Sequence, residues 1–336
     1  MENPNMMQNK LSIRVATAGE ALIDFIGHAD GRFEPCLGGA VYNLTRALAR
    51  QGVDTCYLNP LSRDRFGRQL AQGLVTDGVH LAVADPVVQV TSLAVVNLND
   101  QGHPDYAFYR EGVADRATRA ADLIRACDAL ENLSVVCTGA LALSPDDADT
   151  YLPWLAKQRQ AGRTVVIDAN LRPSVMPDIE LYRRHVLSAL QYADVIKASD
   201  EDLVCLKLPG GDALAQAQHL LQSSRASVMA LTLGGAGAAL LTRHGQVFAA
   251  REPEPIAVVD TVGAGDCFLA GLVVAMLAQK LPADWGTGEV ADEVARPLLT
   301  SAIASASLCV MRRGCVPPTR AEVLARLAQV PYAFAR

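Results

Sequence analysis

Short apolar runs alternate along the chain with longer stretches in which apolar residues recur every three or four positions. The short runs predict buried β-strands at Arg14–Ala18, Thr55–Asn59, Leu133–Thr138, Thr164–Asp168, Asp194–Lys197 and Val228–Leu233. The longer stretches predict helices, among them Val41–Gln51, Asp146–Gln160, Leu181–Tyr192 and Ala213–Gln222. This alternation predicts an α/β fold with a mostly parallel central sheet, in which ligands bind beyond the carboxyl ends of the strands. With no internal repeat or linker, we expect a single domain over residues 1–336.

One region departs from this alternation. Residues 88–110 read as two strands around a turn at Asn99–Pro104, because their apolar positions alternate and the turn residues are polar. Together with Ala21–Phe33 they predict a small β-sheet beside the main one. We expect it to form a lid from about residues 20–36 and 88–118, although an ordinary edge hairpin fits the same pattern.

The composition limits the classes of protein that remain. Of the 336 residues, 50% are hydrophobic and 20% are charged, which supports a large core and is too polar for a membrane protein. The net charge of −6 argues against a nucleic-acid-binding surface. An anionic substrate stays compatible with it if a few Arg or Lys side chains make the site locally positive.

The cysteines and the N-terminal stretch predict a cytoplasmic protein. The eight cysteines contain no CxxC pair and read as buried, reduced thiols. The N-terminal stretch MENPNMMQNKLSIR lacks the apolar core of a signal peptide, and the apolar run Cys267–Ala278 is too short to cross a bilayer. The six histidines have no metal-ligand spacing.

The stretch DTVGAGDCFLAG at Asp260–Gly271 places two glycines and an acid where an apolar helix begins. Gly263 and Gly265 allow the backbone N–H groups to point at an anion, and the helix adds the positive end of its dipole. Asp266 at this place can accept a proton from a nucleophile that attacks phosphorus. Packing glycines with an N-capping Asp would give the same letters. The chain contains neither a Walker A nor a Rossmann GxGxxG pattern.

This stretch resembles the C-terminal signature of the ribokinase-like (PfkB) carbohydrate kinases. LGGAVYNLTRALARQG at Leu37–Gly52 resembles their N-terminal motif, and the resemblance extends over nearly the whole chain. GEALIDF at Gly19–Phe25, FYREGVAD at Phe108–Asp115 and DANLRP at Asp168–Pro173 are most similar to bacterial fructokinases. The resemblance implies a three-layer α/β/α fold with a β-sheet lid and ATP-dependent phosphorylation of a sugar, most specifically D-fructose at O6.

The resemblance also implies roles for individual residues. Asp266 matches the catalytic base, while Gly263, Ala264 and Gly265 match the anion hole for the transferred phosphoryl group. The positions that match sugar-binding residues are Asp24, Gly38, Gly39, Asn43, Arg110 and Arg172. The positions that match the nucleotide site are Lys197, Thr232, Gly234 and Gly237, together with Gly263 and Gly265.

For metals the resemblance is less complete. The family's N-x-x-E motif for Mg²⁺ and phosphate is matched here by Ser199–Asp202, so Asp202 is the Mg²⁺-associated candidate, with most ligands coming from ATP. Asp260, the carbonyl of Val262 and the loop through Gly314 correspond to a monovalent cation site. Pro318 stands where some members have a hydroxyl side chain, which leaves activation by K⁺ open.

Rival functions fit the same motifs. Within the family, the substrate could instead be 2-keto-3-deoxygluconate, ribose or a nucleoside, and a sugar or nucleotide sensor without catalysis is a rival from another class. The intact GAGD disfavours the sensor. The other expected partners are small: a sugar and ATP, with no nucleic acid and no membrane. The exposed edge of the lid predicts a homodimer.

Overall fold

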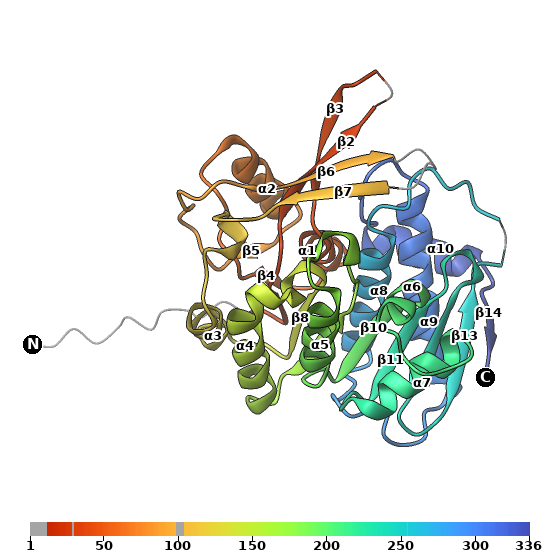
Figure 1. The fold of residues 1–336 in the computed structure, drawn as a ribbon. Helices are drawn as coiled ribbons and strands as arrows, with labels where there is room; N and C mark the ends of the chain where they lie inside the picture. Colours follow the sequence, from red (N-terminus) through yellow and green to blue (C-terminus); the bar gives the residue numbers. More distant parts are fainter. Residues whose placement is uncertain (1–11, 29, 99–103, 254) are drawn as a thin grey trace, which may run out of the picture.

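A computed structural model describes residues 12–28, 30–98, 104–253 and 255–336. Ten strands form the central sheet, in the spatial order β14-β13-β12-β11-β10-β9-β8-β1-β4-β5 (Figure 1). Neighbours from β5 to β11 are parallel and those from β11 to β14 antiparallel. The strands are β1 (Val15–Thr17), β4 (Thr55–Tyr57), β5 (His80–Leu81), β8 (Val135–Gly139), β9 (Thr164–Asp168), β10 (Val195–Ser199), β11 (Val228–Thr232), β12 (Ala238–Thr242), β13 (Val247–Arg251) and β14 (Ala333–Ala335).

Helices cover both faces of this sheet. Successive residues of the central strands point into two different apolar clusters, as Val165 and Val166 of β9 do. This double burial is the reason why the strands are apolar throughout. Over one face lie α3 (Ala120–Asp128), α4 (Ala148–Gln160), α5 (Ile179–Leu190), α6 (Asp200–Cys205) and α7 (Ala213–Ser223); over the other lie α1 (Ala40–Arg50), α8 (Ala264–Ala278), α9 (Asp292–Val310) and α10 (Arg320–Gln329). The predicted three-layer α/β/α fold is confirmed.

The predicted elements recur with small shifts at their ends. The predicted strand Thr164–Asp168 is β9, and the helix predicted from Cys267 begins three residues earlier, at Ala264. The hairpin predicted within Val228–Leu241 is β11 and β12. The sequence patterns did not predict β13 and β14, which extend the sheet beyond that hairpin.

The second sheet has four strands in the order β3-β2-β6-β7 and projects from the main body (Figure 1). Its strands are β2 (Leu22–Gly27), β3 (Phe33–Gly38), β6 (Ser92–Leu98) and β7 (Pro104–Tyr109). The predicted lid sheet therefore exists, but β3 begins where the expected N-terminal strand ended. Gly38 is consequently the last residue of a strand. The predicted turn lies mostly outside the described residues. Near the base of the sheet, α2 (Arg65–Thr76) packs on β2 through an apolar cluster that includes Ile23 and Leu70.

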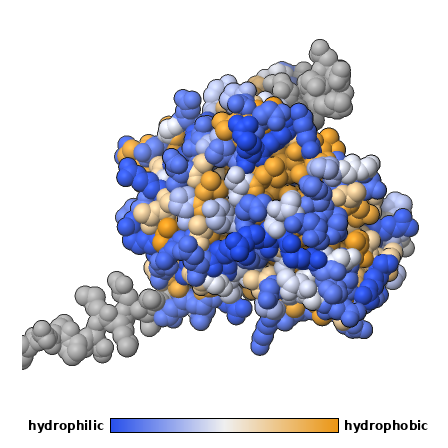
Figure 2. Space-filling view, turned by 60° about the horizontal axis from the view of Figure 1, so that its bottom comes forward, coloured by the Kyte–Doolittle hydropathy of each residue, from blue (hydrophilic) through white to orange (hydrophobic). Residues whose placement is uncertain are grey.

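The face of the molecule drawn in Figure 2 is mainly polar. On the face shown in Figure 2, hydrophilic residues cover most of the area and apolar residues gather in separate patches. Within the described part of the chain, none of the helices has both the length and the apolar character that a bilayer crossing requires.

The backbones of α8 and α9 approach closely at Gly271. A Cβ atom at this position would lie 2.6 Å from the Ser301 carbonyl oxygen and 2.9 Å from Ala302 Cα. We expect Gly271→Val to lower the free energy of unfolding by roughly 1–3 kcal/mol, because two packed backbones must separate. Urea unfolding measures this change. Gly288→Val is the control, since nothing lies within 4 Å of its Cβ position; equal losses in both variants would contradict the assignment.

Candidate active site

The turn that opens α8 requires glycine at its first position. Gly263 is the N-cap residue and has a φ of 79°, in the left-handed region. A Cβ atom there would lie 2.2 Å from Cys315 Sγ. The N–H group of Ala264 donates to the Thr261 carbonyl at 3.2 Å, within the turn itself. The following N–H groups, at Gly265 and Asp266, begin a 15-residue helix and lie at its positive end.

Asp266 is buried in the first turn of α8, with 6% of its surface exposed. Its Oδ2 accepts a hydrogen bond from Asn43 Nδ2 of α1 at 2.9 Å. Burial, followed by the charge of Asp168, raises the pKa of Asp266 to about 7. Asn43 Oδ1 is buried without a hydrogen-bonding partner. The predicted base and one predicted sugar residue are thus neighbours, with one amide acceptor left for a ligand hydroxyl.

Lys197, in the middle of β10, and Asp168, at the end of β9, form a buried ion pair. Lys197 Nζ lies 3.0 and 3.1 Å from the two oxygens of Asp168. The same ammonium would be 2.8 Å from a Cβ atom at Gly265, so it lies directly beside the turn of α8. Burial raises the pKa of Asp168 to about 6 against the opposing effect of Lys197. The ammonium group of this pair therefore lies beside the turn that was predicted to bind an anion.

The side chain of Asp24 in β2 lies against Gly38 at the end of the neighbouring strand β3. A Cβ atom at Gly38 would lie 2.0 Å from Asp24 Oδ2, so glycine at this position leaves room for the carboxylate where it stands. Burial raises the pKa of Asp24 to about 6, while the charge of Arg172 acts to lower it. Gly39 has a φ of 103° and caps α1, and its Cβ position lies 2.8 Å from the Glu20 carbonyl oxygen.

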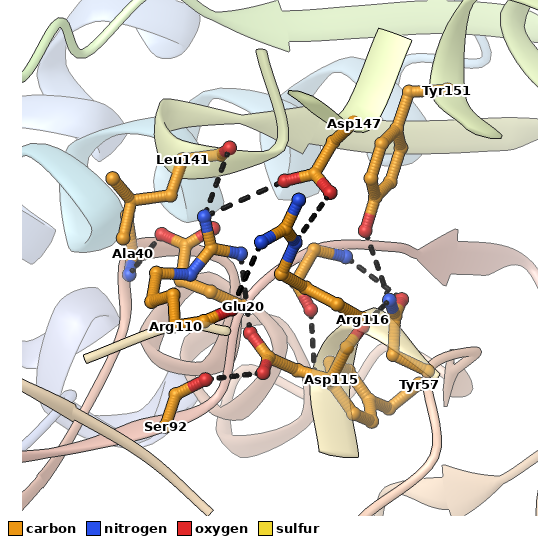
Figure 3. A network of polar contacts seen from close by, with 12 residues as sticks. Glu20, Ala40, Tyr57, Ser92, Arg110, Asp115, Arg116, Leu141, Asp147 and Tyr151 are labelled. Atoms are coloured by element: carbon orange, nitrogen blue, oxygen red, sulfur yellow. Dashed lines mark hydrogen bonds and ion pairs between the residues drawn. The ribbon is translucent and has the colours of Figure 1, made fainter. Parts of the chain in front are cut away.

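Arg110 lies in a network of buried charges where the lid sheet joins the main body (Figure 3). Its guanidinium group contacts Asp115 at 3.4 Å and Asp147 at 3.5 Å, and Arg116 Nε donates to Asp147 at 2.7 Å. Glu20 reaches the same region, with Oε1 accepting the N–H of Ala40 at 3.0 Å. Burial raises the pKa of Glu20 to about 7, and Arg110 opposes this effect. Arg110 therefore connects the lid to the main body.

A cavity of about 940 Å³ extends from the turn of α8 along the ends of β10 and β11. Its lining includes the predicted nucleotide residues Lys197, Thr232, Gly234, Gly237 and Gly265, together with Arg172 and Asp202. Its other wall is apolar and is formed by Ile256, Val258 and Ile303, among others. The cavity thus combines a polar end with an apolar side, as nucleotide sites commonly do.

The two predicted metal residues are both tied to backbone N–H groups. Asp202 Oδ1 accepts the N–H of Leu171 at 2.7 Å and Oδ2 that of Ser199 at 2.8 Å. Together with Ser199 it forms the capping box of α6. Asp260 accepts the N–H of Val262 at 3.0 Å and that of Gly314 at 2.9 Å. The segments expected to surround a monovalent cation are therefore adjacent.

A model of the pfkB family carbohydrate kinases matches residues 12–321. This chain belongs to that family. It is 32% identical to a fructokinase of Rhizobium leguminosarum bv. trifolii over 271 residues, covering 80% of this chain and 81% of the relative. It is 30% identical to a fructokinase of Salmonella typhimurium over 309 residues, covering 91% and 96%. The crystal structure of a fructokinase with bound ATP from Xylella fastidiosa aligns with a TM-score of 0.79 and 28% identity, over 94% of this chain and 98% of that one.

Some residues of this pfkB kinase site escaped the motif-based predictions. Asp168 was predicted as the end of a strand and as the first residue of the DANLRP motif, and Glu20 as part of the GEALIDF motif, but neither was given a role. Their positions after a buried strand and before the lid were the available signals. The apolar wall at residues 255–258 had no signal, because that segment has no regular structure and no periodic pattern.

Asp266→Asn tests how burial of this charge affects stability. The carboxyl has a pKa of about 7 in the folded kinase against an ordinary pKa of 3.8, so the folded state holds the proton more tightly. Relative to the variant, the wild type should lose stability as the pH rises through this interval. We expect the free energy of unfolding of the variant, relative to that of the wild type, to rise by roughly 2 kcal/mol between about pH 5 and about pH 8.5, as measured by urea unfolding. The same difference at both pH values would contradict the burial argument; exposed Asp85→Asn is the control.

Proposed function

We propose that this pfkB kinase is a fructokinase that transfers the γ-phosphoryl group of ATP to O6 of D-fructose. The observation that carries the proposal is the position of the buried carboxylate Asp266 beside the Gly263–Gly265 turn, where that turn meets a cavity of nucleotide size. The relatives named fructokinase support the choice of sugar.

The cavity suits ATP because its two sides differ. Lys197 supplies positive charge beside Gly265, where the phosphates would meet the N–H groups of α8. Thr232, Gly234 and Gly237 border the cavity on the β11–β12 side, and the apolar side chains Ile256 and Val258 offer a surface for a base. The fructokinase of known structure from Xylella fastidiosa was solved with ATP.

Mg²⁺ fits this site as an ion bound mainly by the nucleotide. Asp200, Glu201 and Asp202 line the cavity, and each oxygen of Asp202 accepts only one backbone N–H. When bound with ATP, Mg²⁺ neutralises phosphate charge, and these acids can hold its water ligands. Binding of K⁺ at Asp260, the Val262 carbonyl and Gly314 stays a prediction. So do the cytoplasmic location and the homodimer through the lid.

The sugar side is formed by Asp24, Gly38 and Asn43. A carboxylate accepts hydrogen bonds from two neighbouring hydroxyl groups. Gly38, at the end of β3, leaves space for the Asp24 side chain of β2. Arg172 interacts electrostatically with both Asp24 and Asp266, so it would lie between sugar and phosphate. We assign Arg110 the positioning of the lid, because its guanidinium group is engaged with Asp115 and Asp147.

Asp266 would take the proton from the attacking hydroxyl group. A pKa of about 7 suits a general base at neutral pH, and Asn43 Nδ2 holds the carboxylate in a fixed orientation. As the oxygen–phosphorus bond forms, the proton passes to Asp266 and the leaving group is ADP. The N–H groups at the start of α8 and the Lys197 ammonium stabilise the transferred group, and positioning supplies much of the acceleration.

A panel of acceptors tests the substrate. We expect coupled ADP release to be fastest with D-fructose, and slower with ribose, 2-keto-3-deoxygluconate and nucleosides, because the relatives at 32% and 30% identity are named fructokinase. Phosphorus NMR of the product should place the phosphate at O6. Preference for a nucleoside or a keto-acid would replace the fructose assignment. If no acceptor in the panel leads to ADP release, the result would support the sensor.

Asp266→Ala tests the base. We expect kcat to fall by roughly 10²–10⁴-fold because the variant has no proton acceptor, while the affinity for fructose changes little. Kinetics measure the first quantity and calorimetric titration with fructose the second. Asp85→Ala, at an exposed position, serves as control. Turnover close to that of the wild type in Asp266→Ala would remove the base assignment.

A further inference from the structure

Three thiols from separate segments meet behind the anion-binding turn. Cys267 belongs to the first turns of α8, Cys309 to the end of α9, and Cys315 to the loop that follows α9. The three sulfur atoms all lie within 4.8 Å of one another. Cys267 and Cys309 are buried and Cys315 is half-buried. In the described part of the chain, no other group of three His, Cys, Asp or Glu side chains meets this spacing. We call these residues the thiol cluster.

The spacing of the thiol cluster suits a metal ion. A single buried cysteine is usually a small apolar side chain, but three converging sulfurs present a set of soft ligands. In a tetrahedral zinc site with Zn–S bonds of about 2.3 Å, the sulfurs are about 3.8 Å apart. The observed cluster reaches this arrangement with small movements of its side chains. Such movements are open to Cys315, which lies in a loop.

Charge favours a divalent ion over a monovalent one. Three thiolates around Zn²⁺ leave one net negative charge, whereas three around Cu⁺ leave two, and buried net charge is costly. Three protein ligands also leave a fourth position on zinc. The Val262 carbonyl is close to it, because Cys309 Sγ lies 3.5 Å from this oxygen. We propose that Cys267, Cys309 and Cys315 form a binding site for a thiophilic divalent ion of the Zn²⁺ class, and that its occupation slows phosphoryl transfer.

The coupling to the active site follows from direct contact. Cys315 Sγ lies against Gly263, since a Cβ atom there would be only 2.2 Å away. Cys267 is the residue next to Asp266. A metal–thiolate group would therefore place negative charge directly behind the N–H groups meant for phosphate, and would pull on the turn through Cys315. Both effects weaken an anion hole. This second half of the inference rests on the proposed kinase activity, whereas metal binding itself does not.

Titration of the reduced, metal-free protein with Cd²⁺ tests the site. We expect one equivalent to bind and to produce the ultraviolet charge-transfer absorption of cadmium–thiolate bonds. Competition with a chelator then gives the affinity for Zn²⁺. Cys315→Ser and Cys309→Ala should each lose this absorption, with circular dichroism showing that they fold. Cys127→Ser is the matched control, because Cys127 is a buried thiol that accepts the Trp154 N–H at 3.5 Å and lies in the other apolar cluster.

Kinase assays at buffered Zn²⁺ test the coupling. We expect kcat of the wild type and of Cys127→Ser to fall about tenfold or more, less than the roughly 10²–10³-fold cost of losing an oxyanion donor. Zn²⁺ also binds ATP, so the inhibition counts only if Cys315→Ser escapes it. Binding that survives in both cluster variants, or oxidation of the cluster to a disulfide with no metal uptake by the reduced protein, would overturn the site. Binding without inhibition would overturn only the coupling, and absence of kinase activity would refute the proposed function but not the site.

Discussion

One buried ammonium group, that of Lys197, lies near three buried carboxylates. The buried negative charge therefore exceeds the charge of this ammonium group, and the electrostatics of the site depend on that excess. Lys197 pairs directly with Asp168 and also interacts with Asp202 and Asp266. Burial, followed by the charge of Asp168, raises the pKa of Asp266 to about 7, and the opposing effect of Lys197 is smaller than either. If Lys197 faced Asp266 alone, that carboxyl would be a weaker base. The parallel strands β9 and β10 set this geometry by ending side by side at one edge of the sheet.

The sequence allowed the fold and the centre of the site to be predicted because their signals are local. A fully apolar strand such as β9 and a glycine-rich helix start such as Gly263–Asp266 can each be recognised within a few residues. The Lys197–Asp168 pair could not be predicted in this way. It depends on the register of β9 and β10, and a long segment of chain separates the end of β9 at Asp168 from the start of β10 at Val195. The thiol cluster joins positions 267, 309 and 315, and only tertiary packing brings them together. The antiparallel strands β13 and β14 are partly exposed, and β14 has only three residues, so they lack the continuous apolar run that marks β9.

The glycines of the site have a wider use than the sequence indicated. They were expected to bring bare backbone close to phosphate and sugar. In the structure they also make room for chemically active side chains: the Lys197 ammonium beside Gly265, the Asp24 carboxylate beside Gly38 and the Cys315 thiol beside Gly263. Each glycine thus leaves space for a polar side chain that a Cβ atom at its position would meet at less than 3 Å. These glycines are therefore required by tight packing against neighbouring side chains as well as by the conformation of the backbone.

The contact between Gly38 and Asp24 also restricts how related enzymes can diverge. A larger residue at position 38 collides with the carboxylate as long as Asp24 is present. Loss of the carboxylate removes the collision, so Gly38 is easier to replace after Asp24 has changed than before. A larger residue at position 38 and a carboxylate at position 24 should therefore rarely occur together in related chains.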